Sequence, residues 1–173
     1  MLGMLFLMFL QVPKKIDLDI KHDSCYHFFN GAFEFSCSQN HFGKNTTFIY
    51  RLNGENKTLL KKLDFYTSAM ERSETEWIFG TINGDVILYS DTFELKRVSA
   101  LPVRSEVNKI LKNGTNSAII LAYDGSIYNY DLKTGLFVLL LKVIIGSKLI
   151  YAKKTNLIYI YNLLQIVCYD SSL

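Results

Sequence analysis

Cysteine and proline are both scarce in this chain of 173 residues, which has three cysteines and two prolines. The cysteines are odd in number and show no C-x-x-C spacing, which argues against a disulfide framework. Reduced thiols in an intracellular protein are the interpretation that fits best. The lack of proline, together with 49% hydrophobic and 14% aromatic residues, indicates an ordered globular chain rather than a disordered one.

Sequence signatures of catalysis are missing as well. The chain contains no Gly-rich phosphate loop and no G-x-S-x-G, H-E-x-x-H or paired-carboxylate motif. Potential zinc ligands gather near the N-terminus, but their spacing fits no familiar zinc site. They are His22, Cys25, His27, Cys37 and His41. We therefore expect no catalytic residue, no cofactor and no bound metal, and we predict that the protein is not an enzyme.

An excess of charge of one sign is confined to the end of the chain. The net charge is +3, which by itself is too small to indicate nucleic-acid binding. Beyond Asp131, however, five lysines face a single acid, Asp170. These lysines are Lys133, Lys142, Lys148, Lys153 and Lys154. A solvated basic face is the main interpretation, and a surface that binds phosphate or acidic groups, nucleic acid included, is the alternative.

No hydrophobic run is long enough to cross a membrane. Residues 1–12 are apolar and end at Pro13, whereas a membrane-spanning helix needs about 20 apolar residues. The run also lacks the basic start and the small residues of a signal peptide. We treat residues 1–14 as a separate N-terminal segment: a docked strand, a short buried helix or a non-native start. A signal or anchor is the alternative, to which three N-x-[ST] triplets add little because chance produces such triplets.

The clearest pattern in the chain is a hairpin signal at Asp124-Gly125. These two residues separate apolar runs at 117–123 and 126–131, and Asp-Gly between such runs predicts a tight β-turn. Glycine is favoured there because it has no Cβ and accepts positive φ. A second turn follows and ends at Gly135.

The same pattern recurs along the chain. Asn83-Gly84 stands six residues before Tyr89, as Asp124-Gly125 stands six before Tyr130. Four tyrosines, Tyr50, Tyr89, Tyr130 and Tyr169, are separated by 39, 41 and 39 residues. A period of about forty residues with several short strands in each unit is typical of β-propeller blades. We therefore assign structural roles in repeat turns to Asn83, Gly84, Asp124, Gly125 and Gly135, and roles in the repeat core to the four tyrosines and Trp77.

The repeat resembles a known family. Asp124-Gly125-x-Ile127-x-x-Tyr130-Asp131 resembles the second half of a WD40 repeat with tyrosine in place of tryptophan, and residues 83–90 resemble a degenerate copy. No Gly-His or Trp-Asp dipeptide occurs, so the resemblance does not imply the buried Asp-His-Ser-Trp network of WD40 repeats. Quinoprotein-like propeller repeats are the second choice, because they share the order of turns and aromatic residues in 124–135.

The WD40-like resemblance implies an all-β fold, a propeller-like array of about four four-stranded antiparallel blades. A single domain would span residues 15–173, with units near 25–64, 65–102, 103–142 and 143–173. Six or seven blades are usual, so three outcomes stay open. The ring closes with four blades by using an alternating strand at 16–20, an open arc is completed by another chain, or the chain is a shortened form.

Four local expectations accompany this fold. Residues 38–45 are predicted to form a polar loop, and a short helix over 68–72 is an alternative to a strand at the start of the second unit. Residues 136–141 are apolar on both faces and should be covered by another segment or another chain. Trp77 should pack between blades, with a partner-binding hot spot as the alternative.

The function expected from these features is a non-catalytic protein–protein interaction scaffold that acts as a subunit of a larger intracellular assembly. A protein partner is expected, and in the open arc it would complete the propeller. The alternatives are a secreted or membrane-attached recognition propeller and, less favoured, a cofactor-binding propeller of the quinoprotein-like kind.

Overall fold

The computed structural model describes residues 24–30, 32–41, 44–53, 56–73, 75–152, 157–162 and 166–170. Within these ranges the chain forms strands and turns and contains no helix, which confirms the predicted all-β fold. The strands are β1 (Ser24–Asn30), β2 (Ala32–His41), β3 (Lys44–Asn53), β4 (Asn56–Leu63), β5 (Thr67–Arg72), β6 (Glu76–Thr81), β7 (Asp85–Ser90), β8 (Leu95–Ala100), β9 (Val107–Asn113), β10 (Ser117–Ala122), β11 (Ser126–Asp131), β12 (Phe137–Lys142), β13 (Lys148–Ala152), β14 (Leu157–Tyr161) and β15 (Ile166–Asp170).

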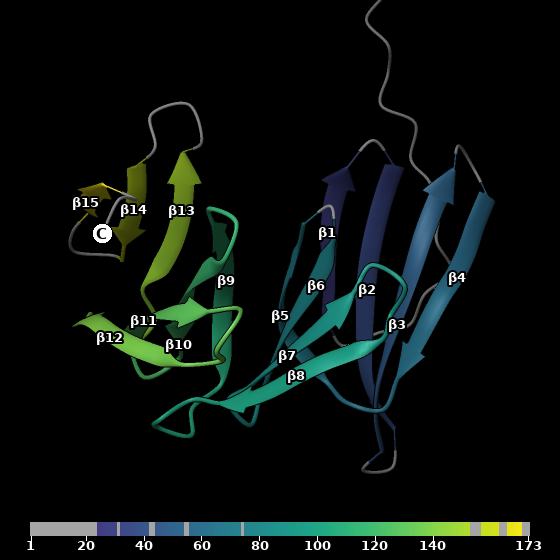
Figure 1. The fold of residues 1–173 in the computed structure, drawn as a ribbon, viewed down its shortest axis with the longest axis horizontal. Helices are drawn as coiled ribbons and strands as arrows, with labels where there is room; N and C mark the ends of the chain where they lie inside the picture. Colours follow the sequence, from purple (N-terminus) through teal and green to yellow (C-terminus); the bar gives the residue numbers. More distant parts are fainter. Residues whose placement is uncertain are drawn as a thin grey trace, which may run out of the picture.

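The strands form four antiparallel sheets, and within each sheet neighbours in space are neighbours in sequence. The first three sheets are β1-β2-β3-β4, β5-β6-β7-β8 and β9-β10-β11-β12, and the described part of the fourth is β13-β14-β15. Figure 1 shows the sheets following one another in an arc, with the first strand of each sheet on the inside. The main contacts between sheets join β1 and β2 to β5, β5 and β6 to β9, and β9 to β13. This is the blade arrangement of a β-propeller. The strand predicted at 16–20 lies outside the described residues, so ring closure through it stays a prediction.

Glycine is required at the turns before the third strands of the second and third sheets. Gly84 and Gly125 have φ of 81° and 86°, a region that residues with a Cβ rarely adopt. A Cβ on Gly84 would lie 2.7 Å from the Ser105 carbonyl oxygen, and a Cβ on Gly125 would overlap the Val143 carbonyl oxygen. Each glycine carbonyl also accepts a 2.8 Å hydrogen bond, from the N–H of Leu101 and of Val143 respectively. Each turn therefore closes a hairpin, β6–β7 or β10–β11, and also holds the end of the outer strand of that sheet, β8 or β12.

Hydrophobic side chains fill the space between successive sheets. The third strand of the third sheet shows how, because alternate side chains of a strand point to opposite faces. Tyr128 and Tyr130 enter the core shared with the second sheet, whereas Ile127 enters the core shared with the fourth. The largest fully buried side chains include Trp77 and Phe79, between the first and second sheets. Each inner sheet is thus buried on both faces, as stacked blades require.

Hydroxyl groups satisfy the polar backbone where the first and second sheets meet. The Thr47 Oγ1 donates to the Phe65 carbonyl oxygen at 2.6 Å and lies 2.8 Å from the Ser38 Oγ and 3.0 Å from the Thr67 Oγ1. All three hydroxyl-bearing residues are buried, and buried polar groups need partners. Serine and threonine therefore supply the polar link between these blades.

A buried carboxylate adds a charged link at the same boundary. The Glu34 carboxylate lies 2.6 Å from the Arg51 Nη2 and 3.5 Å from the Arg72 Nε. The Arg72 guanidinium also lies 4.5 Å from the centre of the Trp77 ring. Side-chain packing and charge pairing thus hold the first sheet on the second.

Polar contacts also tie the second sheet to the third. The Glu76 carboxylate on β6 lies 3.2 Å from the Lys112 Nζ on β9. The Tyr130 hydroxyl on β11 lies 3.0 Å from the Ser99 Oγ on β8. The Arg97 guanidinium on β8 donates to the carbonyl oxygens of the turn between β11 and β12, at 2.9 and 2.5 Å. The two middle sheets are therefore linked at several points along their length.

One local prediction was wrong, and one open alternative is excluded. Residues 68–72 belong to strand β5, as the main interpretation predicted, and the alternative helix does not form, because this segment pairs with β6 and the Ser68 Oγ donates to the Val107 carbonyl oxygen at 2.8 Å. The predicted loop over 38–45 is largely strand, since β2 continues to His41 and β3 begins at Lys44. Backbone pairing is indifferent to side-chain polarity, and the opposed hydroxyls of Ser38 and Thr47 bond to each other.

Candidate functional site

The four tyrosines assigned to the repeat core occupy the third strand of each sheet. Tyr50 lies on β3, Tyr89 on β7, Tyr130 on β11 and Tyr169 on β15. Tyr130 is fully buried, whereas Tyr50 and Tyr89 are half-buried. Burial raises the pKa of the Tyr130 hydroxyl, although its bond to Ser99 opposes the shift. Burial likewise raises the pKa of Tyr50 and of Tyr89. Tyr130 and Tyr89 contact the cores between sheets and so serve packing there. Tyr50 is not among the residues of the described cores, and the side chain of Tyr169 lies outside what the structure describes.

Trp77 lies in the core between the first and second sheets and is 1% exposed. Its ring stacks on Phe79 and Phe93, with ring centroids 6.0 and 5.1 Å away. A partner cannot reach an indole enclosed in this way. The structure therefore places Trp77 in blade packing and away from any binding surface.

The acidic residues of the repeat turns bond to their own turns. The Asp124 carboxylate accepts hydrogen bonds from the N–H of Ser126 at 3.1 Å and from its Oγ at 2.9 Å, and lies 3.5 Å from the Lys142 Nζ. Burial acts to raise the pKa of Asp124, but these bonds and the Lys142 charge outweigh it and the pKa is lowered. The Asp131 carboxylate accepts the N–H groups of Thr134 and Lys133, which lower its pKa. These acids hold turns in shape.

The remaining predicted turn residues lie at the surface. The exposed Asn83 offers its carbonyl oxygen to the Arg104 Nη1 at 3.5 Å. Gly135 has a φ of 78°, and a Cβ there would lie 2.6 Å from the Arg97 Cδ. Both therefore serve the packing of turns against neighbouring arginines.

The described residues contain no group of three or more histidine, cysteine or acidic side chains that could hold a metal ion. Residue His22 and the side chains of the other predicted ligands, Cys25, His27, Cys37 and His41, lie outside what the structure describes. No helix in the described ranges is long and apolar enough to cross a membrane. Cys168 carries a free, exposed thiol.

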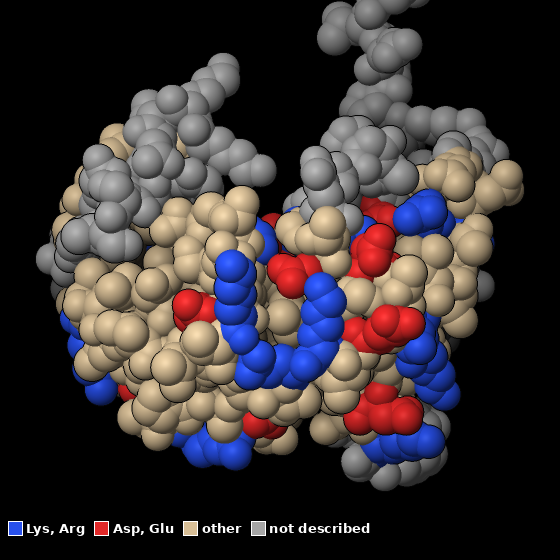
Figure 2. All heavy atoms as spheres, in the orientation of Figure 1, with Lys and Arg blue, Asp and Glu red and all other residues tan. Residues whose placement is uncertain are grey.

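An exposed apolar strand stands out against this background. Leu136, Val138, Leu139 and Leu140 are 66%, 60%, 56% and 36% exposed, and we call these four residues the β12 strip. Strand β12 is the outermost strand of the third sheet and pairs only with β11 within it. In Figure 2 the surface over β12 is largely uncharged. The sequence predicted cover for residues 136–141, yet these four side chains remain open to solvent.

No described strand pairs with the outer edge of β12. The Asp131 N–H donates to the Leu136 carbonyl oxygen at 3.0 Å, and the register then pairs Tyr130 with Phe137. Bonded and non-bonded pairs alternate in an antiparallel ladder, so the N–H and C=O groups of Phe137 and Leu139 point away from β11. Unpaired backbone groups flanked by apolar side chains form a template for another strand.

Positive charges stand at both ends of the β12 strip. The exposed Lys133 lies in the turn before the strand. Lys142 ends the strand, and its side chain is 64% exposed although it lies near Asp124. The strip itself has no carboxylate. The arrangement suits an apolar strand whose ends carry acidic groups.

Comparisons with known proteins address the fold. No family model and no curated protein sequence matches the chain. Among solved structures, the computationally designed Ika4 protein aligns with a TM-score of 0.66 and 12% identity, over 92% of this chain and 99% of its own. The C-terminal WD40 domain of Sif2 aligns with a TM-score of 0.58 and 14% identity, over 80% of this chain and 40% of its own. A chain of the mitotic checkpoint complex aligns with a TM-score of 0.67 and 11% identity, over the whole of this chain and 59% of its own.

The chain thus spans nearly all of the designed protein but well under two thirds of the two natural ones. Identities this low carry the fold and nothing finer. The antiparallel sheets, their order and these neighbours together show that the chain has a WD40-like β-propeller fold.

Proposed function

We propose that the protein is a non-catalytic interaction scaffold within a larger intracellular assembly, and that it binds a protein partner through the β12 strip. The observation that carries this proposal is the exposure of four apolar residues on or next to β12, an outermost strand that pairs on one side only within its sheet. Exposed apolar patches on soluble proteins commonly mark interaction sites. The free exposed thiol of Cys168 is compatible with a reducing compartment.

The partner would supply an extended strand that pairs with the outer edge of β12. Its apolar side chains would cover Val138 and Leu139, and acidic groups near its ends would approach Lys133 and Lys142. Covering each half-exposed side chain is worth on the order of 1 kcal/mol. Association costs offset part of this gain, so we expect a dissociation constant of roughly 1–100 μM for the strip alone.

The test uses two valines of nearly equal exposure on two outer strands. Val138 on β12 is 60% exposed and Val98 on β8 is 56% exposed. The partner is recovered from native extract with the full chain, purified, and titrated by calorimetry against the wild type, Val138→Lys and Val98→Lys. We expect Val138→Lys to weaken binding at least about tenfold, because the interface would bury an unpaired ammonium group, whereas Val98→Lys should leave affinity unchanged.

Equal weakening by the two variants, or full affinity in Val138→Lys, would contradict the assignment of the site. A chain that stays a partner-free monomer in native extract would contradict the scaffold function itself.

A further inference from the structure

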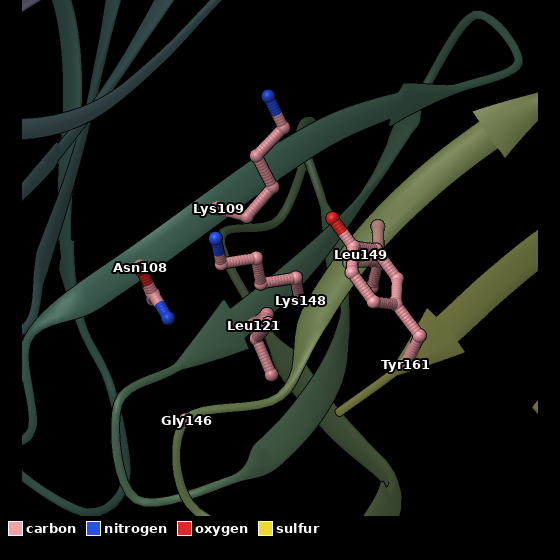
Figure 3. A pocket seen from close by; sticks show the side chains of 7 residues that line it. All are labelled: Asn108, Lys109, Leu121, Gly146, Lys148, Leu149 and Tyr161. Carbon is pink, nitrogen blue, oxygen red and sulfur yellow. The ribbon is translucent and has the colours of Figure 1, made fainter. Parts of the chain in front are cut away.

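A pocket between the third and fourth sheets is a separate feature that the β12 strip does not use. Its volume is about 280 Å³. Two strands that begin adjacent blades, β9 and β13, form its sides (Figure 3). The lining side chains that matter here are Asn108, Lys109, Leu121, Lys148, Leu149 and Tyr161.

Two lysines give the pocket its charge. In Figure 3 the Lys148 side chain extends from β13 toward β9, which carries Lys109. Neither ammonium group makes an ion pair or a hydrogen bond with another residue of the described part of the chain, although the backbones of both lysines pair within their sheets. No aspartate or glutamate is among the described residues that line the pocket. In Figure 3 the Lys109 ammonium group extends from β9 away from that of Lys148, so an anion bound by both would draw two flexible side chains together.

Several other cationic side chains of the second and third sheets, unlike Lys109 and Lys148, are paired with carboxylates. Lys96 and Lys112 each lie 3.2 Å from the Glu76 carboxylate, and Arg104 lies 2.5 Å from that of Asp85. These side chains have carboxylate partners within the chain, whereas Lys109 and Lys148 have none among the described residues. Their ammonium groups are therefore available to an anion from outside.

We propose that this pocket binds a phosphate monoester. Lysine ammonium groups bind phosphate as point charges, and a phosphate monoester carries a charge of roughly −1.5 to −2 at pH 7, against a single negative charge for a carboxylate, so two lysines with no acid in the described lining favour the monoester. The Asn108 amide and the Tyr161 hydroxyl add neutral donors. Leu121 and Leu149 are buried and provide an apolar floor for the organic part of the ester.

The size of the pocket limits the ligand. A volume of about 280 Å³ exceeds what a bare phosphate needs and lies at the small end of ligand pockets. The organic group would therefore be small, as in a sugar phosphate or a phosphorylated side chain. Because Lys109 and Lys148 belong to different sheets, the bound ester would also join the third sheet to the fourth.

The experiment titrates the full chain by calorimetry with glucose 6-phosphate and, in parallel, with a short neutral peptide that carries one phosphoserine. The relative affinities of these probes distinguish a free metabolite from a modified protein as the source of the phosphate. Sodium acetate at equal ionic strength tests carboxylate binding, and a single-stranded oligonucleotide tests nucleic-acid binding. We expect at least one monoester to bind more tightly than acetate and to raise the melting temperature.

Three variants locate the site. Lys109→Met and Lys148→Met keep the aliphatic stem but remove the charge, and each should weaken monoester binding roughly tenfold. Lys44→Met removes the same charge from an exposed position on the first sheet, outside the pocket, and should weaken it less than about twofold. Circular dichroism and thermal melting confirm that each variant is folded before it is titrated.

Three results would overturn the proposal. The first is that neither monoester binds the wild type at about 10 mM. The second is that Lys44→Met weakens binding as much as the pocket variants do. The third is that the oligonucleotide binds while both monoesters fail. The last result would assign the basic surface to nucleic acid instead. The β12 strip has no part in any of these measurements, so its own test stands independently.

Discussion

Strands β8 and β12 are both the outermost strands of four-stranded sheets, both contain six residues, and both pair with one neighbour within their sheet. Their side chains differ. β8 carries Lys96 and Arg97 in the middle of the strand, whereas the only charge on β12 is Lys142 at its end. Charged side chains in the middle of an edge strand oppose pairing with another chain. The charges of β8 therefore oppose its pairing with another chain, and β12 has no such charge in its middle.

The charges of β8 also have partners inside the molecule. Lys96 lies 3.2 Å from the Glu76 carboxylate, and Arg97 donates to the carbonyl oxygens of Thr134 and Lys133. These bonds direct the polar groups of β8 toward its own sheet and the next. On β12, by contrast, apolar side chains face solvent and the outer backbone groups point outward. Exposed apolar residues therefore favour pairing with another chain mainly on an edge strand that has no charged side chain in its middle.

The largest expected effect concerns Gly84 and Gly125, the turn glycines before β7 and β11, whose carbonyl oxygens hold the ends of β8 and β12. Gly125→Ala should lower the free energy of unfolding by about 3 kcal/mol, because positive φ and the overlap with the Val143 carbonyl oxygen act together. Gly84→Ala should lower it by about 2 kcal/mol, since its closest contact, the Ser105 carbonyl oxygen, is 2.7 Å away. Urea unfolding measures both values.

Gly114→Ala is the control for backbone strain alone. Gly114 has a φ of 69°, but a Cβ there would meet nothing within 4 Å. Its cost should be about 1 kcal/mol. Equal losses of unfolding free energy at Gly84, Gly114 and Gly125 would show that the close approach of a neighbouring carbonyl oxygen adds nothing to the strain of positive φ.

A smaller effect is expected when β8 is given the character of β12. The double variant Lys96→Val and Arg97→Val should self-associate in a concentration-dependent way, because it places apolar residues beside the exposed Leu95 and Val98. Its stability should fall by about 1–2 kcal/mol, since the exposed Lys96–Glu76 pair contributes little but the Arg97 hydrogen bonds to the Lys133 and Thr134 carbonyl oxygens are lost as well. Sedimentation velocity measures the association.

The matched control replaces the same two residues by glutamine, which removes the charges without adding apolar surface. It should remain in the association state of the wild type. Association in the glutamine variant, or none in the valine variant, would show that side-chain charge does not protect β8.

The smallest effect concerns Asp124, which lies beside the single charge of β12. The pKa of Asp124 is lowered in the folded chain, so its contribution to stability is present above the unfolded pKa of about 3.9 and is lost as pH falls through the lower folded value. Asp124→Asn should therefore cost less than about 1 kcal/mol at pH 7 and close to nothing near pH 2. Urea unfolding at several pH values tests this, and a cost that does not change with pH would refute it.

Local chemistry made much of the fold predictable. Asp124-Gly125 and Asn83-Gly84 identify turns because the conformation depends on the residues in the turn itself. The four tyrosines recur with a period of about forty residues because each lies on the third strand of a repeated sheet. The error at 38–45, and the helix left open as an alternative at 68–72, arose where pairing with another strand, rather than local propensity, decides the structure.

The candidate sites were predictable only in part. The apolar run at 136–141 is evident in the sequence, but its exposure depends on which strand of the sheet is outermost. The lysine excess beyond Asp131 includes Lys148 but not Lys109, which precedes it by about forty residues. Only the packing of the third sheet against the fourth brings these two side chains to one pocket.

The bonds that Glu76, Ser99 and Arg97 make from the second sheet to the third have a consequence for how the molecule opens. Several such links, added to a continuous hydrophobic core, bind the two middle sheets into one cooperative unit. Amide hydrogens of β6, β7, β10 and β11 should then exchange with solvent last, when that unit unfolds as a whole. The fourth sheet, attached on one side only among the described residues, can detach by a partial opening that leaves the middle of the molecule intact.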